Sequence, residues 1–373
     1  GSDCCCEEKM IPVCEPTLDG NELKYVVDCM HTGWISSGGK YVKQFEEDFS
    51  KFVGLKHGIS NSNGTTALHL AIEALGIGEG DEVIVPEFTM MAVPNSVFYS
   101  GAIPITIDSE SETWNMDPEL IESRITDKTK AIIVAHVYGH PADMNKIMSI
   151  AKKYDLKVIE DCAEVHGATY EGKMCGNFGD IACFSFYGNK IITTGEGGMC
   201  LTNDDTLAEE MRKLKNHYFG NPRFLHEKLG YNYRMTNIHA AIGVAQVEYA
   251  DKLIQARIDN AHKYNELLAP LEFFNLPTCR AKVKNVYWMY GVTIKDASKI
   301  SKEDFMIRLK EKGVDTRSFF YPVSMQASYT RVVDSELIQD APVAKHLYEH
   351  GFYLPSGGSL TDKQIETVVK KIK

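Results

Sequence analysis

Short apolar runs alternate with amphipathic segments along the first part of the chain. Each run is too short for a helix and predicts a buried strand, whereas apolar residues at helical spacing predict helices between the strands. The predicted strands are 55–61, 82–86, 103–107, 131–137, 157–160, 181–186 and 198–202. The predicted helices are 19–29, 42–52, 67–75, 89–100, 118–125, 144–154 and 204–216. This alternation predicts an α/β fold with a large, mostly parallel sheet covered by helices on both faces.

The pattern changes after residue 216. A long, alanine-rich helical run covers 238–268, and two short predicted strands, 286–294 and 319–321, follow it. They mix with the predicted helices 302–312, 343–350 and 362–371. We therefore predict a large domain over residues 1–250 and a smaller α/β domain over residues 251–373. Residues 1–16 are polar and rich in cysteine, and we expect them to form a loose extension.

Composition and charge narrow the class of partner. The 373 residues are 44% hydrophobic and 24% charged, as in an ordinary globular protein. The net charge of −11, without a long Lys/Arg run, argues against nucleic acid or an anionic membrane as the main partner. It leaves room for a phosphorylated small molecule held by backbone amides. Because no apolar run is long enough for a membrane span and the start lacks an apolar signal core, we expect a cytoplasmic protein.

The 10 cysteines do not form a spaced metal-binding pattern. Cys4, Cys5 and Cys6 are contiguous, and the others are scattered without a Cys-x-x-Cys pair. Thiolate metal sites usually take their ligands in spaced pairs, so reduced thiols are the better interpretation. We expect no metal, and a metal site at the N-terminal cluster stays as the alternative.

A possible anion site follows the first predicted strand. The segment Asn61-Ser-Asn-Gly-Thr-Thr66 opens an apolar helical run. The first amides of a helix are unpaired and its dipole favours negative charge, so Gly64 and Thr65 could bind a phosphate. The segment lacks the Gly-Lys-Ser/Thr ending of a Walker loop. An ordinary helix capped by Thr65 or Thr66 is the structural alternative.

A single lysine stands in a glycine-rich turn between two predicted strands. Ser185 lies in the first strand, Lys190 follows a Gly-Asn turn, and the Thr-Thr-Gly-Glu-Gly-Gly segment 193–198 leads into the next strand. A lysine in such a place can be a solvated surface residue. Apolar flanks, and glycines that permit close backbone approach, instead favour the desolvated, nucleophilic amine that a Schiff base needs.

Side chains that suit pyridoxal phosphate (PLP) follow the predicted strands at their carboxyl ends, where ligands bind in parallel sheets. PLP needs an amine, an acid for its ring nitrogen, an aromatic face, a phosphate cup and a partner for its hydroxyl. The chain offers Lys190, Asp161 and Phe88 for the first three, Gly64, Thr65 and Ser185 for the cup, and Glu164 for the hydroxyl. Each has a structural alternative, such as a helix cap or a core aromatic. Their joint occurrence at strand ends favours the cofactor site.

Four segments resemble the DegT/DnrJ/EryC1/StrS sugar aminotransferases. They are 63–69, 160–167, 184–198 and 231–237, and the resemblance runs from about Ile11 to the C-terminus. It implies the fold of aspartate aminotransferase, PLP fold type I, with PLP as the cofactor. Related dehydratases carry histidine in place of the lysine, so Lys190 implies transamination.

The resemblance also implies a role for each matching residue. It assigns Lys190 to cofactor attachment and proton transfer, Asp161 to the pyridine nitrogen, Phe88 to ring stacking, Glu164 to the ring hydroxyl, and Gly64, Thr65 and Ser185 to the phosphate. Asn237 is expected to reach the phosphate of a neighbouring subunit. This last role implies a homodimer with shared active sites.

The implied reaction transfers the amino group of L-glutamate to the C4 ketone of a nucleotide-linked 4-keto-6-deoxyhexose. GDP-linked 4-keto-6-deoxymannose is the first expectation, a UDP- or dTDP-linked 4-keto-6-deoxyglucose is the alternative, and a 3-keto sugar is a weaker one. A non-catalytic PLP-binding regulatory module is the alternative outside enzymes. The presence of both Lys190 and Asp161 argues against it, because binding alone does not require both.

One loop departs from the pattern of the family. Residues 320–324 carry Tyr321 and Ser324 where many relatives have histidines. This loop is expected to lie near the sugar nucleotide, so Tyr321 is an expected substrate contact. Trp34 and Ser36, in the turn-rich segment 32–39, are the other two, and a core-capping role for Trp34 is the alternative.

Overall fold

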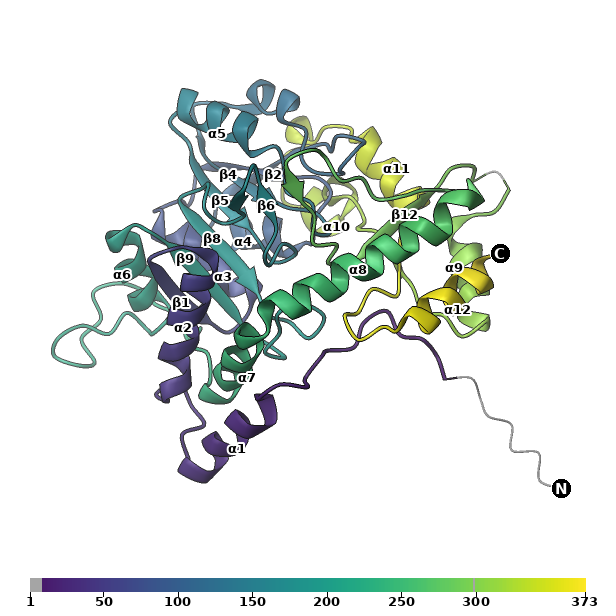
Figure 1. Ribbon diagram of the computed structural model, residues 1–373. Coiled ribbons are helices and arrows are strands. Elements are labelled where there is room, and N and C mark those ends of the chain that lie inside the picture. The colour runs from purple at the N-terminus through teal and green to yellow at the C-terminus, as the bar shows by residue number, and fades with distance from the viewer. Residues whose placement is uncertain (1–8, 298) are drawn as a thin grey trace.

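A computed structural model of the protein, which describes residues 9–297 and 299–373, is built around a seven-stranded sheet (Figure 1). Its strand order is β1-β9-β8-β5-β4-β2-β3. The strands are β1 (His57–Asn61), β2 (Glu82–Pro86), β3 (Ile103–Ile107), β4 (Thr129–Ala135), β5 (Lys157–Asp161), β8 (Ile181–Ser185) and β9 (Gly198–Thr202). Every neighbouring pair from β3 to β8 is parallel, and β9 runs antiparallel to both of its neighbours. The predicted α/β fold with a mostly parallel sheet is confirmed.

Helices cover both faces of this sheet because successive strand residues point to opposite sides. Val83, Val85 and Ile133 belong to the core beneath α3 (Gly64–Ala74), α4 (Ala92–Tyr99) and α6 (Asp205–Leu214). Ile84 and Ile132 belong to the core beneath α5 (Met144–Lys153). The helices α1 (Glu22–Thr32), α2 (Lys40–Val53) and α7 (Asn237–Glu248) contact one another beside the β1–β9 end of the sheet. The continuous apolar strands of the sequence thus reflect burial on both sides.

The C-terminal part is organised around the long helix α8 (Ala250–Leu268), which crosses the front of the molecule in Figure 1. Beyond it lies a four-stranded sheet in the order β10-β12-β14-β13, flanked by three helices. The strands are β10 (Phe274–Asn275), β12 (Tyr290–Ile294), β13 (Arg317–Ser318) and β14 (Gly351–Leu354), and the helices are α9 (Lys302–Glu311), α11 (Pro342–His350) and α12 (Asp362–Ile372). The predicted domain boundary falls at the start of α8 and stays a prediction.

Short elements complete the fold. A three-stranded sheet joins β6 (Thr169–Tyr170), β7 (Lys173–Met174) and β11 (Val283–Lys284), the last of which comes from the C-terminal part of the chain. The remaining single turns are η3 (Ala269–Leu271), η4 (Val323–Met325), α10 (Ala327–Thr330) and η5 (Ser335–Leu337). None of the small strands was predicted, because a run of two residues carries no hydrophobic period.

Three predicted elements are wrong. The helix expected over 118–125 is a pair of 3-10 turns, η1 (Pro118–Leu120) and η2 (Glu122–Arg124), and Ile125 after them is already extended. The helix expected over 238–268 breaks at Tyr249, whose backbone is not helical, so α7 stays against α1 and α2 while α8 takes its own direction. The strand expected over 319–321 is not formed, because the neighbouring pair 317–318 bonds to β14 and the next two aromatic side chains turn into an aromatic cluster.

The described part of the expected N-terminal extension is not loose. Ile11 pairs with Val314 and exchanges hydrogen bonds with the backbone of residues 313 and 315. Ile11 and Val13 are both buried against the C-terminal part of the chain. The contiguous cysteines 4–6 lie outside the described residues.

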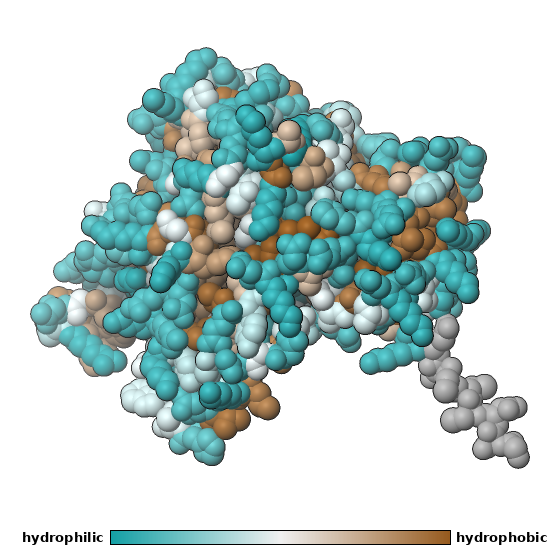
Figure 2. All heavy atoms as spheres, in the orientation of Figure 1, coloured by the Kyte–Doolittle hydropathy of each residue, from teal (hydrophilic) through white to brown (hydrophobic). Residues whose placement is uncertain are grey.

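The visible surface is mostly hydrophilic, with an apolar area at its lower tip (Figure 2). Helix α1 lies at this tip in Figure 1, and its exposed apolar residues include Leu23, Val27 and Met30. Within residues 9–297 and 299–373, no helix is long and apolar enough to cross a bilayer.

Candidate active site

Lys190 lies in the loop between β8 and β9. Its Nζ is 3.7 Å from the centroid of the Trp288 ring, and no side chain in the described ranges accepts a hydrogen bond from it. Burial lowers the pKa of the Lys190 amine, and the negative charges of Glu164 and Asp161 oppose this shift. The amine is therefore desolvated and unbonded, beside two carboxyl groups.

Both carboxyl groups reach this place from the carboxyl end of β5. Asp161 is the last residue of β5, beside Cys183 of β8, and its Oδ1 accepts a hydrogen bond of 3.1 Å from the N–H of Ala163. Burial raises the pKa of Asp161. An Oε2 atom of Glu164 accepts a 2.6 Å bond from the N–H of Tyr138, and burial raises the pKa of Glu164 to about 7. The two acids are thus fixed by backbone donors, which leaves one oxygen of Asp161 for a ligand.

The start of α3 supplies open donors. Asn63 and Thr66 form a reciprocal capping box, so Asn63 is the cap and Thr65 is not. Over the described chain, the N–H groups of Gly64 and Thr65 have no protein acceptor. A Cβ atom built on Gly64 would lie 2.7 Å from the Cβ of Ser185, so only glycine lets the helix start approach the end of β8 this closely. Two amides and two hydroxyl side chains therefore meet where a phosphate can bind.

Three residues linked to Lys190 or to its neighbour Glu164 carry unpartnered polar atoms. The described chain has four buried side-chain atoms without a hydrogen-bond partner, and three of them are Tyr138 OH, His166 Nδ1 and Asn189 Oδ1. The N–H of Tyr138 donates a hydrogen bond to Glu164, and Asn189 precedes Lys190 in the chain. The positive charge of Lys190 contributes to the lowered pKa of His166. Since buried polar groups in native proteins are nearly always bonded, their concentration here fits a bound polar group.

Phe88 contacts Tyr138, but neither face of its ring is accessible. Its side chain has 0% exposure and contacts Tyr138, Phe319 and Phe320 at ring-centroid distances of 5.4 to 5.9 Å. A ring without accessible surface can stack on a cofactor only if one of these neighbours moves. The stacking role of Phe88 stays a prediction on that condition.

The prediction that Asn237 reaches a neighbouring subunit is wrong. Asn237 is 1% exposed, and its Oδ1 accepts a 2.9 Å bond from the N–H of Tyr41 while its Nδ2 donates a 2.7 Å bond to the carbonyl of Trp34. Its amide thus holds the segment 32–39 against α2 and has no reach beyond its own chain. Asn232 of the same motif is exposed.

The three predicted substrate contacts lie in two places. Trp34 and Tyr321 are exposed on the surface, and the ring of Tyr321 stands edge-on to Tyr348. Ser36 lines an open pocket of about 820 Å³. The cationic side chains of this pocket are those of Arg212, Lys215, Arg223 and Arg234. Ser36 therefore lies in a pocket with cationic side chains. Tyr321 does not line this pocket and belongs to the C-terminal part of the chain.

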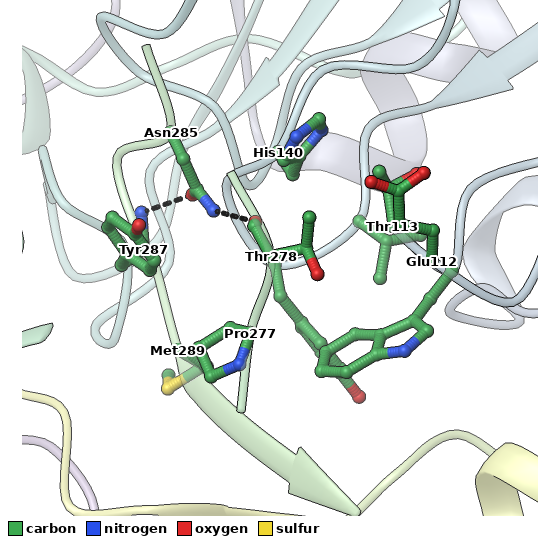
Figure 3. Close-up of a pocket in the computed structure, with 11 residues that line it drawn as sticks. Glu112, Thr113, His140, Pro277, Thr278, Asn285, Tyr287 and Met289 are labelled. Atoms are coloured by element: carbon green, nitrogen blue, oxygen red, sulfur yellow. Dashed lines mark hydrogen bonds between the residues drawn. The ribbon is translucent and has the colours of Figure 1, made fainter. Parts of the chain in front are cut away.

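Two other features near the site carry no ligand chemistry. The hollow in Figure 3, lined by His140, Thr278 and Tyr287 among others, encloses about 10 Å³, which is room for one water at most. His136, Glu160 and Cys162 lie close enough to share a metal ion. However, His136 bonds Glu160 and the N–H of residue 142, and Glu160 also accepts three backbone N–H groups, so their lone pairs are already used.

Two site residues could not be assigned from the sequence. Arg257 is 4% exposed and donates to the carbonyl groups of Asn189 and Trp288. Its signal in the sequence is a charge on the buried face of α8, between Ile254 and Ala261. Trp288, whose ring lies under the lysine amine, could not be recognised as a site residue, because a tryptophan just before a strand is usually a core residue.

The comparisons with known proteins agree with this geometry. Residues 16–373 match the DegT/DnrJ/EryC1/StrS aminotransferase family. The chain is 45% identical to GDP-perosamine synthase of Escherichia coli O157:H7, over 98% of both chains, and 44% identical to GDP-perosamine synthase of Caulobacter vibrioides, over 96% of both. A protein from Streptococcus pneumoniae described as a "putative sugar aminotransferase", solved in its PLP form, is 26% identical and superimposes with a TM-score of 0.91 over 98% of both chains.

PLP is the cofactor, and the residues present fit it: an unbonded, half-buried amine, a half-buried carboxylate with an unused oxygen, and open donors at a helix start. The matched region takes in the predicted strands, the lysine loop and α8. The chain belongs to the DegT/DnrJ/EryC1/StrS aminotransferase family.

Proposed function

We propose that this chain transfers the amino group of L-glutamate to the C4 ketone of GDP-linked 4-keto-6-deoxymannose and forms GDP-perosamine. The observation that carries the substrate is the 45% identity, over 98% of the chain, to an enzyme named GDP-perosamine synthase. The amino transfer rests on the family and on Lys190 and Asp161, which are both half-buried and both have an atom available to the cofactor.

The chain's own residues supply positioning and proton transfer. PLP, when bound, withdraws electrons from the carbon that loses a proton. We assign its ring nitrogen to Asp161 and its phosphate to Gly64, Thr65 and Ser185. The neutral Nζ of Lys190 takes the proton from Cα of glutamate and, in the second half of the reaction, delivers a proton to C4 of the sugar. A desolvated amine suits this work because its lowered pKa leaves more of it unprotonated.

The pocket around Ser36 supports a nucleotide-linked substrate. In the described ranges, Arg223 and Arg234 of this pocket have no carboxylate partner, whereas Arg212 and Lys215 pair with Glu46. Two uncompensated guanidinium groups suit a diphosphate, which each can bind in bidentate fashion. We place the diphosphate of the sugar nucleotide in this pocket, next to Ser36.

A UDP- or dTDP-linked 4-keto-6-deoxyglucose is the alternative within this reaction, and nothing in the geometry favours it. The test is an incubation of the protein with glutamate and GDP-, UDP- and dTDP-linked 4-keto-6-deoxy sugars in parallel, with aminated product detected by mass. We expect amination of the GDP sugar. Amination of a UDP or dTDP sugar alone would overturn the GDP assignment, and no amination, with cofactor absorption unchanged by glutamate, would favour a regulatory module.

A homodimer is the second part of the proposal. Leu23 and Met30 of α1 are 76% and 63% exposed, and Trp34 and Ile35 just after α1 are exposed as well. A contiguous apolar area of this kind marks an interaction surface, and a self-complementary one gives a two-fold dimer. Dimer formation around α1 would also bring Asn232 and the pocket at Ser36 close to a second chain.

The dimer is tested with the double variant Leu23→Asp/Met30→Asp. We expect sedimentation or light scattering to give twice the chain mass of 41.8 kDa for the wild type and the single mass for the variant. Ile307→Asp, on the exposed side of α9 and far from α1 in Figure 1, is the matched control and should stay dimeric. A monomeric wild type with full activity would contradict the proposal.

We also infer a cytoplasmic location. The seven cysteines in the described ranges are free thiols, and five of them are buried. Free thiols are typical of proteins in reducing compartments.

A further inference from the structure

Arg257 carries a buried positive charge that no carboxylate of residues 9–297 and 299–373 neutralises. Its Nη1 donates a 2.6 Å bond to the carbonyl of Trp288, and its Nη2 donates a 3.2 Å bond to the carbonyl of Asn189. Nη2 also lies 3.5 Å from the Sγ of Cys14, and its described hydrogen-bond partners include no acid. Burial of an unpaired cation is costly, so a residue of this kind calls for a functional explanation.

The bonds of Arg257 converge on the peptide that precedes the reactive lysine. The carbonyl of Asn189 accepts Nη2 of Arg257, Nε1 of Trp288 at 2.8 Å and the thiol of Cys14 at 3.7 Å. Arg257 also bonds the carbonyl of Trp288, whose ring lies under Nζ of Lys190. One guanidinium thus fixes both the backbone before Lys190 and the aromatic surface beneath its amine.

The charge of Arg257 acts on Lys190 against two carboxylates. The charged and titratable groups that face the amine are Asp161 and Glu164 from the β5 end, His166 after them, Arg257 from α8 and Cys14 from the N-terminal segment. Asp161 and Glu164 favour the ammonium form, and Arg257 disfavours it. A cationic neighbour is a known way to keep a catalytic lysine neutral.

We propose that Arg257 is a positioning residue of the amino-transfer reaction, whose guanidinium fixes the carbonyls of Asn189 and Trp288 around Lys190 and whose positive charge opposes a second positive charge on the Lys190 amine. This inference rests on the proposed role of Lys190. It concerns the state of one amine in the chain, so it can be measured without turnover.

The test is the pH dependence of Lys190 acylation in the full chain after removal of the cofactor, followed by peptide mass spectrometry. Relative to the wild type, Arg257→Met should raise the pH of half-maximal labelling by about one unit, because burial alone then opposes the two carboxylates. Arg257→Lys keeps the charge and should label as the wild type does. Arg124→Met is the matched control, since Arg124 is also buried and donates to a backbone carbonyl, that of residue 337.

Turnover gives the second readout. In the holoenzyme we expect kcat to fall about tenfold or more in both Arg257→Met and Arg257→Lys, because the lysine loop loses its anchor, with KM for the sugar nucleotide unchanged. If Arg257→Met does not fold, Arg257→Gln takes its place, since it can still donate one bond to the Asn189 carbonyl.

Failure of this inference differs from failure of the proposed function. An unchanged labelling pH in the folded Met or Gln variant, with a wild type that transfers amino groups, would overturn the role of Arg257 alone. The same rise in Arg257→Lys would assign the effect to the lost hydrogen bonds and overturn the role of its charge. A wild type that aminates no sugar, with the expected labelling shift intact, would overturn the proposed function and leave the effect of Arg257 on Lys190 standing.

Discussion

Lys190→Ala is expected to abolish amino transfer and the absorption band of the lysine-bound cofactor. The Nζ of Lys190 is the amine that the site presents, and it is also the group that we assign to both proton transfers. Loss of the proton transfers alone lowers the rate on the order of 10²- to 10⁴-fold, and loss of the attachment adds to this. We expect no turnover above about one thousandth of the wild-type rate.

The control is Lys252→Ala, which removes an exposed lysine whose contact with Asp19 spans 3.7 Å and contributes little to stability. It should keep both the absorption band and the activity. A small primary amine in the buffer should restore part of the lost activity to Lys190→Ala, because it can take the place of Nζ as the base. Turnover of Lys190→Ala near the wild-type rate, without added amine, would show that another group carries the chemistry.

The sequence was most informative where a functional side chain lies at or just after the end of a buried strand. Asp161 and Ser185 end two neighbouring parallel strands, and their positions relative to the sheet follow from the strand pattern alone. Lys190 lies in the loop that follows Ser185, so its place at the same edge also follows. The first turn of α3 was found in the same way, since a glycine after a strand permits the close approach that the structure shows between Gly64 and Ser185.

The sequence was least informative where a side chain acts on a distant segment. Asn237 stands in a motif that suggested a second subunit, yet its amide bonds Tyr41 and Trp34 in its own chain. Arg257 bonds a carbonyl 68 residues away, and no local period encodes such a contact. The closed aromatic cluster around Phe88 depends on Phe319 and Phe320 from the C-terminal part, which the pattern placed in a strand.

The environment of the site brings the pKa of an amine, Lys190, and the pKa of an acid, Glu164, closer together. Burial lowers the pKa of Lys190 and raises the pKa of Glu164 to about 7. The positive charge of Lys190 and the negative charge of Glu164 attract each other, and this attraction opposes both pKa shifts. A ligand that changes either charge therefore changes the pKa of the other group. Groups whose pKa lies near the working pH exchange protons most effectively, which suits a reaction that moves a proton off one carbon and onto another.

Asp161→Asn is expected to slow amino transfer on the order of 10²- to 10³-fold while the cofactor stays attached to Lys190. Asparagine has nearly the same shape and can still accept the 3.1 Å bond from the N–H of Ala163, so the fold should persist. It cannot carry the negative charge that keeps a proton on the ring nitrogen, and removal of one preorganised electrostatic contact has an effect of this size. The loss should appear in the half-reaction with glutamate, measured alone by rapid mixing.

Two comparisons separate this charge effect from simple damage to the site. Asp205→Asn removes an exposed carboxylate that pairs with Lys56 and His57, and it should leave the half-reaction unchanged. Added primary amine should not rescue Asp161→Asn, in contrast to Lys190→Ala, because its defect lies at the ring nitrogen and its lysine is intact. A wild-type rate in Asp161→Asn, or rescue by the amine, would mean that the Asp161 carboxylate serves the structure of the β5 end and not the cofactor.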